Sequence, residues 1–372
     1  MAQHSRAVKQ DEMLSGEWHT AQTWDEVLAQ CDQRLQQDAS DGSAWQQRSY
    51  VLALMGRYDE AISSYQKTLA IVTEDAKVWC NYGSALAAAG WLTEAVKAYD
   101  RALDIQPGYA KVWLRRGRVF YRLGEYARAM ESYDQALAIA PDDGSIWYAK
   151  GLAAYQLSFI DDAIFDFQEA LRLNPDLDEA YLALSYALIR KGAYAKALTM
   201  LAIPIERGWD NPKLYECRAY LLHRQGQSQA ALTEIQQATA LEPDNAQVWF
   251  QQGLLHARLG QYPEAHESIR QSLKRQAYSA KSWLALGLTL RRLNAYQDAI
   301  EAFNKALAIA PDHPFAFFQQ AACYEALGRH QWAVEHLRRA IAIDGDYYRR
   351  RAQHDPDLRN LLTALRDGLQ TA

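Results

Sequence analysis

The feature that most constrains the fold of this chain is an aromatic residue that recurs every 34 positions. The nine members of the series are Trp45, Trp79, Trp113, Trp147, Tyr181, Tyr215, Trp249, Trp283 and Phe317. An alanine follows each of them sixteen residues later, at Ala61, Ala95, Ala129, Ala163, Ala197, Ala231, Ala265, Ala299 and Ala333. A period of this length, kept without insertion over nine repeats, predicts a linear array in which each repeat packs on its neighbours.

Each repeat contains two segments with helical spacing of apolar residues, separated by a turn position. That position lies eleven residues after the aromatic and holds glycine in seven repeats, with Ser158 and Asn294 in the other two. We expect a left-handed backbone conformation there, which ends the first helix. The recurrent alanine predicts a close approach of two helices. Five prolines end the second helix at one position, namely Pro107, Pro141, Pro175, Pro243 and Pro311. The aspartates at the next position are candidate N-caps of the following helix: Asp142, Asp176, Asp210, Asp244 and Asp312.

This pattern resembles that of the tetratricopeptide repeat (TPR) family, whose 34-residue signature reads W–LG–Y–A–F–A–P. In the third repeat those places hold Trp113, Gly117, Phe120, Ala129, Tyr133, Ala136 and Pro141. The resemblance implies an all-α fold, a right-handed superhelical solenoid of helix-turn-helix repeats. We number repeat positions from 1 to 34, with Gly42 at position 1 of the first repeat.

The domain boundaries follow from the limits of this register. We expect a mobile N-terminal tail over residues 1–21, an N-terminal half-repeat helix over 22–41, nine tandem repeats over 42–347 and a C-terminal capping helix over 348–372. Repeat 5 departs from the pattern because Pro204 stands inside its second helix. Proline removes a backbone donor, so we expect a shortened or kinked helix and a changed angle between repeats 1–5 and repeats 6–9.

Composition narrows the function without defining it. The net charge is −5, from 40 Lys and Arg against 45 Asp and Glu, which excludes a globally basic nucleic-acid binder. No apolar run approaches the roughly 18 residues of a membrane span, and the N-terminus lacks a signal-peptide core. The four cysteines are widely separated, which fits neither a disulfide framework nor a zinc site and predicts a cytoplasmic protein.

Motifs for catalysis are absent from the sequence. It contains no HExxH, GxGxxG, GxxxxGK[ST] or GxSxG, and its nine histidines are scattered. We therefore expect no enzymatic activity, no catalytic residue, no cofactor and no metal.

In the family that the sequence resembles, first helices line a concave groove, and repeat positions 2, 5, 6, 9, 12 and 13 face the ligand. Transferred to this chain, these positions give a candidate peptide-binding groove of Lys77, Asn81, Lys111, Arg115, Arg118, Tyr121, Arg122, Tyr155, Tyr186, Arg190, Tyr220, Arg224, Arg258 and Arg292. Cations and aromatic rings together suit an extended peptide that carries carboxylates and apolar anchors. The alternatives are solvated family-consensus positions for the arginines and packing between repeats for the tyrosines.

The sequence thus favours a non-catalytic protein–protein interaction scaffold or adaptor, with an assembly factor as one form, that binds an acidic or mixed peptide. Three alternatives stay open: a regulatory subunit that docks on a catalytic partner, a co-chaperone-like clamp for a C-terminal carboxylate, and nucleic-acid binding by the arginine row, which the net charge disfavours. Asn81, Lys111 and Arg115 match three of the five clamp positions, whereas Gln46 and Tyr50 replace the other two. Self-association through an end of the array also stays open.

Overall fold

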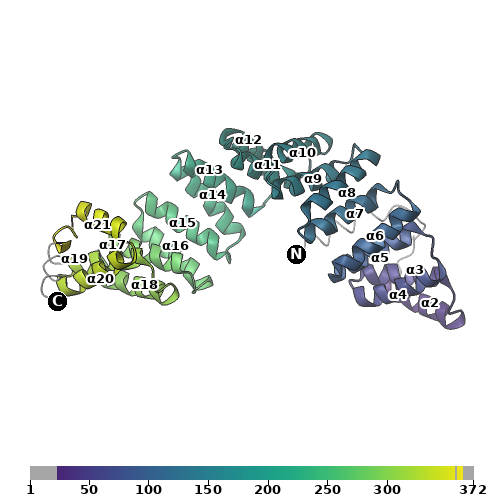
Figure 1. Ribbon diagram of the computed structural model, residues 1–372, viewed down its shortest axis with the longest axis horizontal. Helices are drawn as coiled ribbons and strands as arrows, with labels where there is room; N and C mark the ends of the chain where they lie inside the picture. Colours follow the sequence, from purple (N-terminus) through teal and green to yellow (C-terminus); the bar gives the residue numbers. More distant parts are fainter. Residues whose placement is uncertain (1–22, 357, 363–372) are drawn as a thin grey trace. The chain divides into compact units, whose positions relative to one another are not determined.

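The computed structural model describes residues 23–356 and 358–362, and this part of the chain is helical throughout, without a β-strand (Figure 1). Helix pairs follow one another along the sequence, one pair for each repeat. The expected tail over residues 1–21 and the end of the expected capping segment, 363–372, lie outside the described residues. The chain divides into an N-terminal unit that ends at Lys191 and a C-terminal unit that begins at Gly192, within the turn of repeat 5.

The N-terminal unit starts with α2 (Trp24–Gln37), which Thr23 caps with a capping box. Four helix pairs follow: α3 (Gly42–Leu54) with α4 (Tyr58–Ile71), α5 (Ala76–Ala89) with α6 (Leu92–Ile105), α7 (Ala110–Arg122) with α8 (Tyr126–Ile139), and α9 (Gly144–Gln156) with α10 (Ile160–Leu173). The unit ends with α11 (Asp178–Arg190), the first helix of repeat 5.

The C-terminal unit starts with α12 (Tyr194–Glu206), the second helix of repeat 5. Its pairs are α13 (Pro212–Arg224) with α14 (Ser228–Leu241), α15 (Ala246–Arg258) with α16 (Tyr262–Arg275), α17 (Ala280–Arg292) with α18 (Tyr296–Ile309), and α19 (Pro314–Ala326) with α20 (His330–Ile343). A final helix, α21, spans Gly345–His354, and beyond it Leu358 and Leu361 are buried in the same core as α20.

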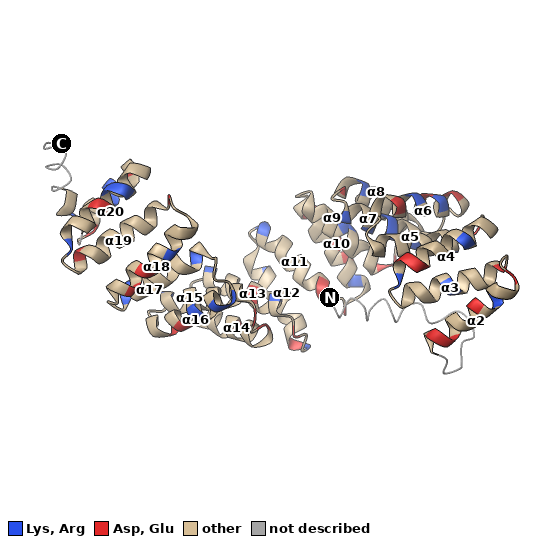
Figure 2. Cartoon of the chain, turned by 90° about the horizontal axis from the view of Figure 1, so that it is seen from below, with Lys and Arg blue, Asp and Glu red and all other residues tan. Residues whose placement is uncertain are grey.

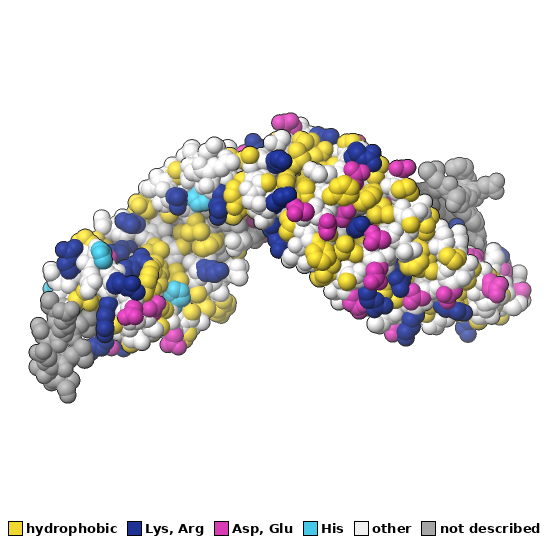
Figure 3. All heavy atoms as spheres, turned by 45° about the horizontal axis from the view of Figure 1, so that its top comes forward, with side chains coloured by type: hydrophobic (Ala, Val, Ile, Leu, Met, Phe, Trp, Pro, Cys, Tyr) yellow, Lys and Arg dark blue, Asp and Glu magenta, His cyan; other side chains and the backbone are white. Residues whose placement is uncertain are grey.

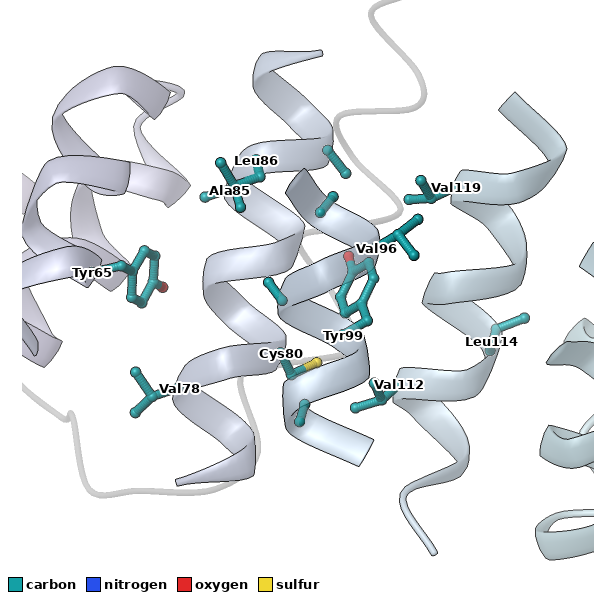
Figure 4. Close-up of a cluster of buried hydrophobic side chains, with 14 of the residues drawn as sticks. Tyr65, Val78, Cys80, Ala85, Leu86, Val96, Tyr99, Val112, Leu114 and Val119 are labelled. Atoms are coloured by element: carbon teal, nitrogen blue, oxygen red, sulfur yellow. The ribbon is translucent and has the colours of Figure 1, made fainter. Parts of the chain in front are cut away.

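The closest approach within a repeat is between position 8 of the first helix and position 24 of the second. A Cβ on Gly117 would lie 2.5 Å from the Tyr133 ring, and one on Gly83 would lie 2.8 Å from the Tyr99 ring. Figure 4 shows Tyr99 among side chains of α5 and α7. The nine recurrent alanines at position 20 are all fully buried, which confirms the predicted close contact.

The recurrent tryptophan at position 4 fixes the connection between repeats. Its indole Nε1 donates to the carbonyl six residues earlier, in the turn that precedes the helix. The bonds run from Trp45 to Ala39, Trp79 to Thr73, Trp113 to Pro107, Trp147 to Pro141, Trp249 to Pro243 and Trp283 to Ala277, at 2.8–3.0 Å. Each bond ties a carbonyl of the turn to the side chain of a half-buried indole, so it stabilises the path of the chain into the first helix.

The turns inside the repeats have the predicted backbone conformation. All seven glycines at that position have positive φ, between 70° and 91°, and so do Ser158 (φ 66°) and Asn294 (φ 59°). The capping prediction was wrong by one residue. The side chains that accept from the next helix belong to the following position, as in Asp143, Asn211 and Asn245. Asp142, Asp176, Asp210, Asp244 and Asp312 therefore stand one residue too early to be N-caps.

Helix α12 runs through Pro204 and ends at Glu206, so it has 13 residues where the complete second helices have 14. The proline lies in the last turn, where its ring is buried, and its missing donor costs a single intrahelical bond. The C-terminus of α12 differs from those of the other second helices more than its length does. Gly208 adopts φ 78° and Trp209 N donates to the Pro204 carbonyl at 2.9 Å, a termination that the first helices use.

A basic side chain at position 7 links successive repeats on the side away from the first-helix surface. Arg116 Nε donates to Asp100 Oδ1 at 2.7 Å and Arg116 Nη1 donates to Ser132 Oγ at 2.9 Å. Lys150 pairs in the same way with Asp134 at 2.7 Å. These bonds run from a first helix to the second helices on either side of it, so they add polar specificity to the packing.

Repeat 4 changes this arrangement, because Asp166 replaces the serine that repeats 1 and 3 have at position 23. Asp166 is 2% exposed, and its Oδ2 has no hydrogen-bond partner in the described part of the chain. Burial raises the pKa of this carboxyl to about 7, although the charge of Lys150 lowers it. Ionised Asp166 therefore destabilises the N-terminal unit.

We predict that Gly117→Ala lowers the free energy of unfolding by about 1–3 kcal/mol, because the added methyl group overpacks the Tyr133 ring. Gly108→Ala is the control, since a Cβ at Gly108 meets no atom within 4 Å. Urea unfolding of both variants measures the difference. Equal stability of the two would show that the ring can move aside at little cost.

We predict that Asp166→Ser raises the melting temperature at pH 8 and that the gain shrinks as the pH falls. The pKa is raised in the folded state from 3.8 to about 7, so the cost of ionisation is complete above pH 7, declines between pH 7 and 4, and vanishes below. At pH 5.5 about half of the pH-dependent gain should remain. Thermal unfolding of both proteins across this range measures it, and a pH-independent difference would contradict the assignment.

Candidate functional site

The first helices of successive repeats lie against one another, α3 with α5, α5 with α7, α7 with α9 and α9 with α11 in the N-terminal unit, and α15 with α17 and α17 with α19 in the C-terminal unit. Successive second helices show no comparable approach in the described residues. Each unit therefore curves toward its first helices, whose exposed side chains form a concave surface. We call these surfaces the N-terminal concave surface (α3 to α11) and the C-terminal concave surface (α13 to α19).

All fourteen residues of the predicted groove lie on first helices. Helix α5 carries Lys77 and Asn81; α7 carries Lys111, Arg115, Arg118, Tyr121 and Arg122; α9 carries Tyr155; α11 carries Tyr186 and Arg190; α13 carries Tyr220 and Arg224; α15 carries Arg258; and α17 carries Arg292. The division at Lys191 assigns ten of them to the N-terminal unit and four to the C-terminal unit.

Four of the five first helices of the N-terminal unit carry basic residues and no acidic ones; the fifth, α11, begins with Asp178 and Glu179. Helices α3, α5, α7 and α9 contain eight Lys and Arg residues and no Asp or Glu, and five of the eight lie on α7. Figure 2 shows the basic and acidic residues along the helices, and Figure 3 shows hydrophobic side chains between charged ones on one face. The acidic excess of the whole chain therefore does not extend to these four helices.

Arg115 is held in place by the preceding repeat. It is half-buried, and its Nη1 donates to Ser84 Oγ at 2.9 Å and to Cys80 Sγ at 3.3 Å. Ser84 Oγ donates to the Cys80 carbonyl at 2.9 Å, so the Tyr99 hydroxyl, 3.1 Å away, acts as a donor to it. Burial raises the pKa of Tyr99 to about 12, and that hydroxyl stays protonated. A buried polar network therefore orients this guanidinium.

Arg118 lies one helical turn further along α7 and is exposed. Its charge acts on three tyrosine hydroxyls beneath the surface, those of Tyr99, Tyr133 and Tyr148. Burial raises the pKa of Tyr148 to about 12, and the nearby Arg118 charge opposes that rise. Arg118 is therefore an exposed cation whose charge acts on three tyrosine hydroxyls.

The arginines at position 13 have a structural role in two repeats. Arg122 Nη1 donates to the Ala87 carbonyl at 2.7 Å, and Arg190 Nη1 donates to the Tyr155 carbonyl at 3.2 Å. Both carbonyls belong to the last turn of the preceding first helix, where the helix dipole favours a cation. Arg224 instead lies over the Tyr194 ring, 5.4 Å from its centroid. The sequence did not reveal these capping contacts because they join residues of adjacent repeats that lie 35 positions apart.

The tyrosines of the predicted groove divide in the same way. Tyr121 contacts the Tyr126 ring at 5.2 Å between centroids and accepts a bond from Gln156 at 3.3 Å, and the guanidinium of Arg190 covers the Tyr155 ring at 4.9 Å. Both are half-buried. Tyr186 and Tyr220, at position 9, are 38% and 46% exposed. Packing therefore accounts for much of the first pair, whereas the second pair presents an aromatic face to solvent.

The structure brings together Lys77, Asn81, Lys111, Arg115 and Arg118 on the adjacent helices α5 and α7. In the C-terminal unit, Arg258 and Arg292 are exposed and form no hydrogen bond or ion pair with the described residues. Sequence reasoning missed the leucines at position 9, which are Leu152, Leu254 and Leu288 on α9, α15 and α17. Counting position 9 through every repeat would have found them.

The described residues provide no other obvious centre of chemistry. No cluster of His, Cys, Asp or Glu among them could hold a metal ion. Their four cysteines are all buried thiols. None of the described helices is long and apolar enough to cross a membrane.

A linear stack of helix pairs with close contacts at positions 8, 20 and 24 defines an α-solenoid of 34-residue repeats. The chain belongs to the tetratricopeptide repeat family. One tetratricopeptide repeat model matches residues 47–110, 148–212, 218–265 and 250–314, and a second matches residues 86–153. Proteins with this fold serve as scaffolds that bind protein partners, and the family is generally non-catalytic. No curated protein matches the sequence significantly.

A solved structure shows the same fold. This tetratricopeptide repeat protein from Parabacteroides merdae is 21% identical over 67% of this chain and 98% of its own, with a TM-score of 0.52. Two further matches have lower scores. MamA from Desulfovibrio magneticus is 23% identical over 46% of this chain and 97% of its own (TM-score 0.43). Cut9–Hcn1 of the APC/C is 14% identical over 92% of this chain and 82% of its own (TM-score 0.46).

We predict that Arg122→Ala lowers the free energy of unfolding by about 1 kcal/mol, because the last turn of α5 loses a charged donor. Arg258→Ala and Arg292→Ala should change stability by less than about 0.5 kcal/mol. Alanine is an apt replacement, since Ala88 and Ala326 hold the same position in repeats 2 and 9. Urea unfolding of the three variants tests the distinction, and equal losses would mean that the whole arginine row is structural.

Proposed function

We propose that the protein is a non-catalytic scaffold whose N-terminal concave surface binds an acidic segment of a partner protein. The observation that carries this proposal is the group of five cations at groove positions of α5 and α7, namely Lys77, Lys111, Arg115, Arg118 and Arg122, in a chain of net charge −5. Helices α3, α5, α7 and α9 contain no Asp or Glu that could neutralise them, and their other three cations, Arg48, Arg116 and Lys150, pair with aspartates of second helices. Such a surface attracts carboxylates and disfavours basic segments.

The recognition centre in this proposal is the group of Lys77, Asn81, Lys111, Arg115 and Arg118 on α5 and α7. The guanidinium of Arg115 is held by Ser84 and Cys80 before a ligand binds, so binding a carboxylate near it costs little further side-chain entropy. Arg118, Lys77 and Lys111 are exposed and supply charge-assisted donors around it. Their different depths suit an extended peptide with several carboxylates rather than a single anion.

In this proposal, Tyr121 and Tyr155 provide the apolar contacts beside the recognition centre. Tyr121 and Tyr155 stand near the ends of α7 and α9, each with its ring partly buried against a neighbour. A half-buried ring still offers its remaining face to a partner side chain at low entropic cost. The peptide that fits best therefore alternates Asp or Glu with apolar residues, which is the mixed composition expected from the sequence.

The test replaces three exposed cations by the residue that the array itself uses nearby. Ser43 and Ser145 occupy position 2 in repeats 1 and 4, and Ser84 occupies position 9 in repeat 2. We predict that the triple variant Lys77→Ser, Lys111→Ser, Arg118→Ser weakens binding of a labelled Glu- and Leu-containing peptide about tenfold or more. Fluorescence anisotropy at two salt concentrations measures the loss, and wild-type binding should weaken with salt.

The control removes as much positive charge from second helices of repeats 1 and 2. Lys67, Lys97 and Arg101 are exposed on α4 and α6, and their triple serine variant should bind the peptide like wild type. Thermal unfolding of both variants checks that the fold is kept. Retained binding in the α5–α7 variant, or an equal loss in the control, would reject this surface. Co-purification from the native host followed by mass spectrometry then identifies the partner.

A further inference from the structure

The C-terminal concave surface carries an unbroken apolar row at repeat position 9, which lies at the middle of each first helix. In repeats 6, 7 and 8 this position holds Tyr220, Leu254 and Leu288. In repeats 2 and 3, where the recognition centre lies, it holds the polar residues Ser84 and Arg118. The 34-residue register therefore sets three apolar side chains in a row along α13, α15 and α17 of the C-terminal unit.

This apolar row is open to solvent. Tyr220 is 46% exposed and Leu254 is 44% exposed, whereas Leu288 is half-buried against the core of repeats 7 to 9. Phe250 lies one turn before Leu254 on α15 and is also half-buried at the edge of that core. Isolated exposed leucines are common, but Leu254 and Leu288 hold the same position on α15 and α17, which contact each other. Exposed apolar side chains that gather on adjacent helices mark interaction sites.

A basic row runs beside the apolar one. Arg224, Arg258 and Arg292 each follow a member of the apolar row by four residues, which places them on the same helix face, one turn further on. Arg258 and Arg292 are exposed and form no hydrogen bond or ion pair with the described residues. Helices α15 and α17 contain no Asp or Glu that could neutralise them. The acidic Glu216 on α13 is already paired with Lys213 at 2.7 Å.

The N-terminal unit has apolar residues at position 9 too, but without this basic row. Leu152 and Tyr186 hold the position in repeats 4 and 5, and Leu152 is half-buried. The residues four places further on are Gln156, which is uncharged, and Arg190, which bonds the Tyr155 carbonyl. The combination of an apolar row with available arginines is therefore a property of the C-terminal concave surface.

We propose that the C-terminal concave surface is a second, separate binding site, and that its occupant is an amphipathic partner helix with an apolar stripe flanked by Asp and Glu. The apolar stripe packs on Tyr220, Leu254 and Leu288, and the acidic flank faces Arg258 and Arg292. This site shares no residue with the recognition centre proposed on α5 and α7, so either can fail without the other.

Two arguments favour a helical partner over an extended one: the spacing of the rows that it must contact, and the hydrogen bonds of its own backbone. Neighbouring helices pack about 8–10 Å apart, and α15 and α17 are in direct contact. An α-helix repeats the same face every seven residues, or about 10.5 Å, whereas a strand repeats it at about 6.6 Å. An extended chain would also lay unpaired backbone N–H and C=O groups on Leu254 and Leu288, which cannot bond them, whereas a helix satisfies its own.

The test uses a synthetic helical peptide of about 20 residues, long enough to cross three rows, with Leu at every seventh position and Glu along one flank. One control peptide carries Lys in place of Glu. A second keeps the Leu and Glu residues but contains prolines that prevent helix formation. The protein is the full chain with Lys77→Ser, Lys111→Ser and Arg118→Ser, so that the recognition centre on α5 and α7 does not contribute. We expect fluorescence anisotropy to show binding of the acidic helix alone, with binding that weakens as salt is added.

Two variants locate the contact, and both use residues that the array itself tolerates. The first variant combines Leu254→Ala and Leu288→Ala; alanine is already present at position 9 in repeat 9, as Ala322. The second variant combines Arg258→Ala and Arg292→Ala; alanine is already present at position 13 in repeats 2 and 9, as Ala88 and Ala326. Each pair should weaken binding of the acidic helix about tenfold or more, and the arginine pair should also remove most of the salt dependence.

The matched control, Leu241→Ala with Arg270→Ala, changes exposed residues of the second helices α14 and α16 and should bind like wild type. Both groove variants and this control are made in the triple serine background of α5 and α7. Equal binding of the Lys peptide, equal or stronger binding of the proline peptide, or full affinity in both groove variants would overturn the proposal. Because the arginine pair does not touch the core, it decides the outcome even if the leucine pair lowers stability.

Discussion

The structure depends on one close contact, repeated along the chain, in which a position-24 side chain packs where the first helix has only glycine or another small residue. Gly83 and Gly117 leave no room for a Cβ beneath Tyr99 and Tyr133, and the fully buried alanine at position 20 closes the same gap one turn earlier. The contact fixes the distance and the angle between the two helices of a repeat. Any change in one repeat would alter its stacking on the next, which explains the absence of insertions.

The stacking of repeats also uses arginines that the sequence analysis assigned to ligand binding. Arg122 and Arg190 bond carbonyls of the preceding first helix, and Arg115 bonds Ser84 and Cys80. The last turn of one first helix lies beside the next first helix. An arginine on the concave surface can therefore either bond a carbonyl of that last turn or bind a ligand. The residues most available to a ligand are therefore those whose own repeat has no such carbonyl or hydroxyl within reach.

The sequence predicted the fold in detail because the fold is local and periodic. Nine aromatics and nine alanines at 34-residue spacing specify each helix pair, and the positive φ of Ser158 and Asn294 follows from register alone. The candidate site was harder to predict. The period predicts which face of a helix is exposed. It does not predict that Arg122 bonds the Ala87 carbonyl, 35 residues away at the end of helix α5, because a backbone acceptor leaves no side-chain pattern. Pro204 drew attention to repeat 5, but the division at Lys191, in the turn of that repeat, could not be predicted because the register continues across it.

A repeat array can hold two kinds of surface on one scaffold because its framework and its exposed positions are nearly independent. Positions 8 and 20 stay small and position 24 stays large on both sides of Lys191. Position 9, in contrast, changes from Ser84 and Arg118 in repeats 2 and 3 to Tyr220, Leu254 and Leu288 in repeats 6 to 8. Substitutions at position 9 leave the contact between positions 8 and 24 untouched, so charge and apolar area can vary along the array without loss of the fold. Two partners of different chemistry can then be held on one chain, and the affinity for each is set by a handful of side chains that this contact does not use.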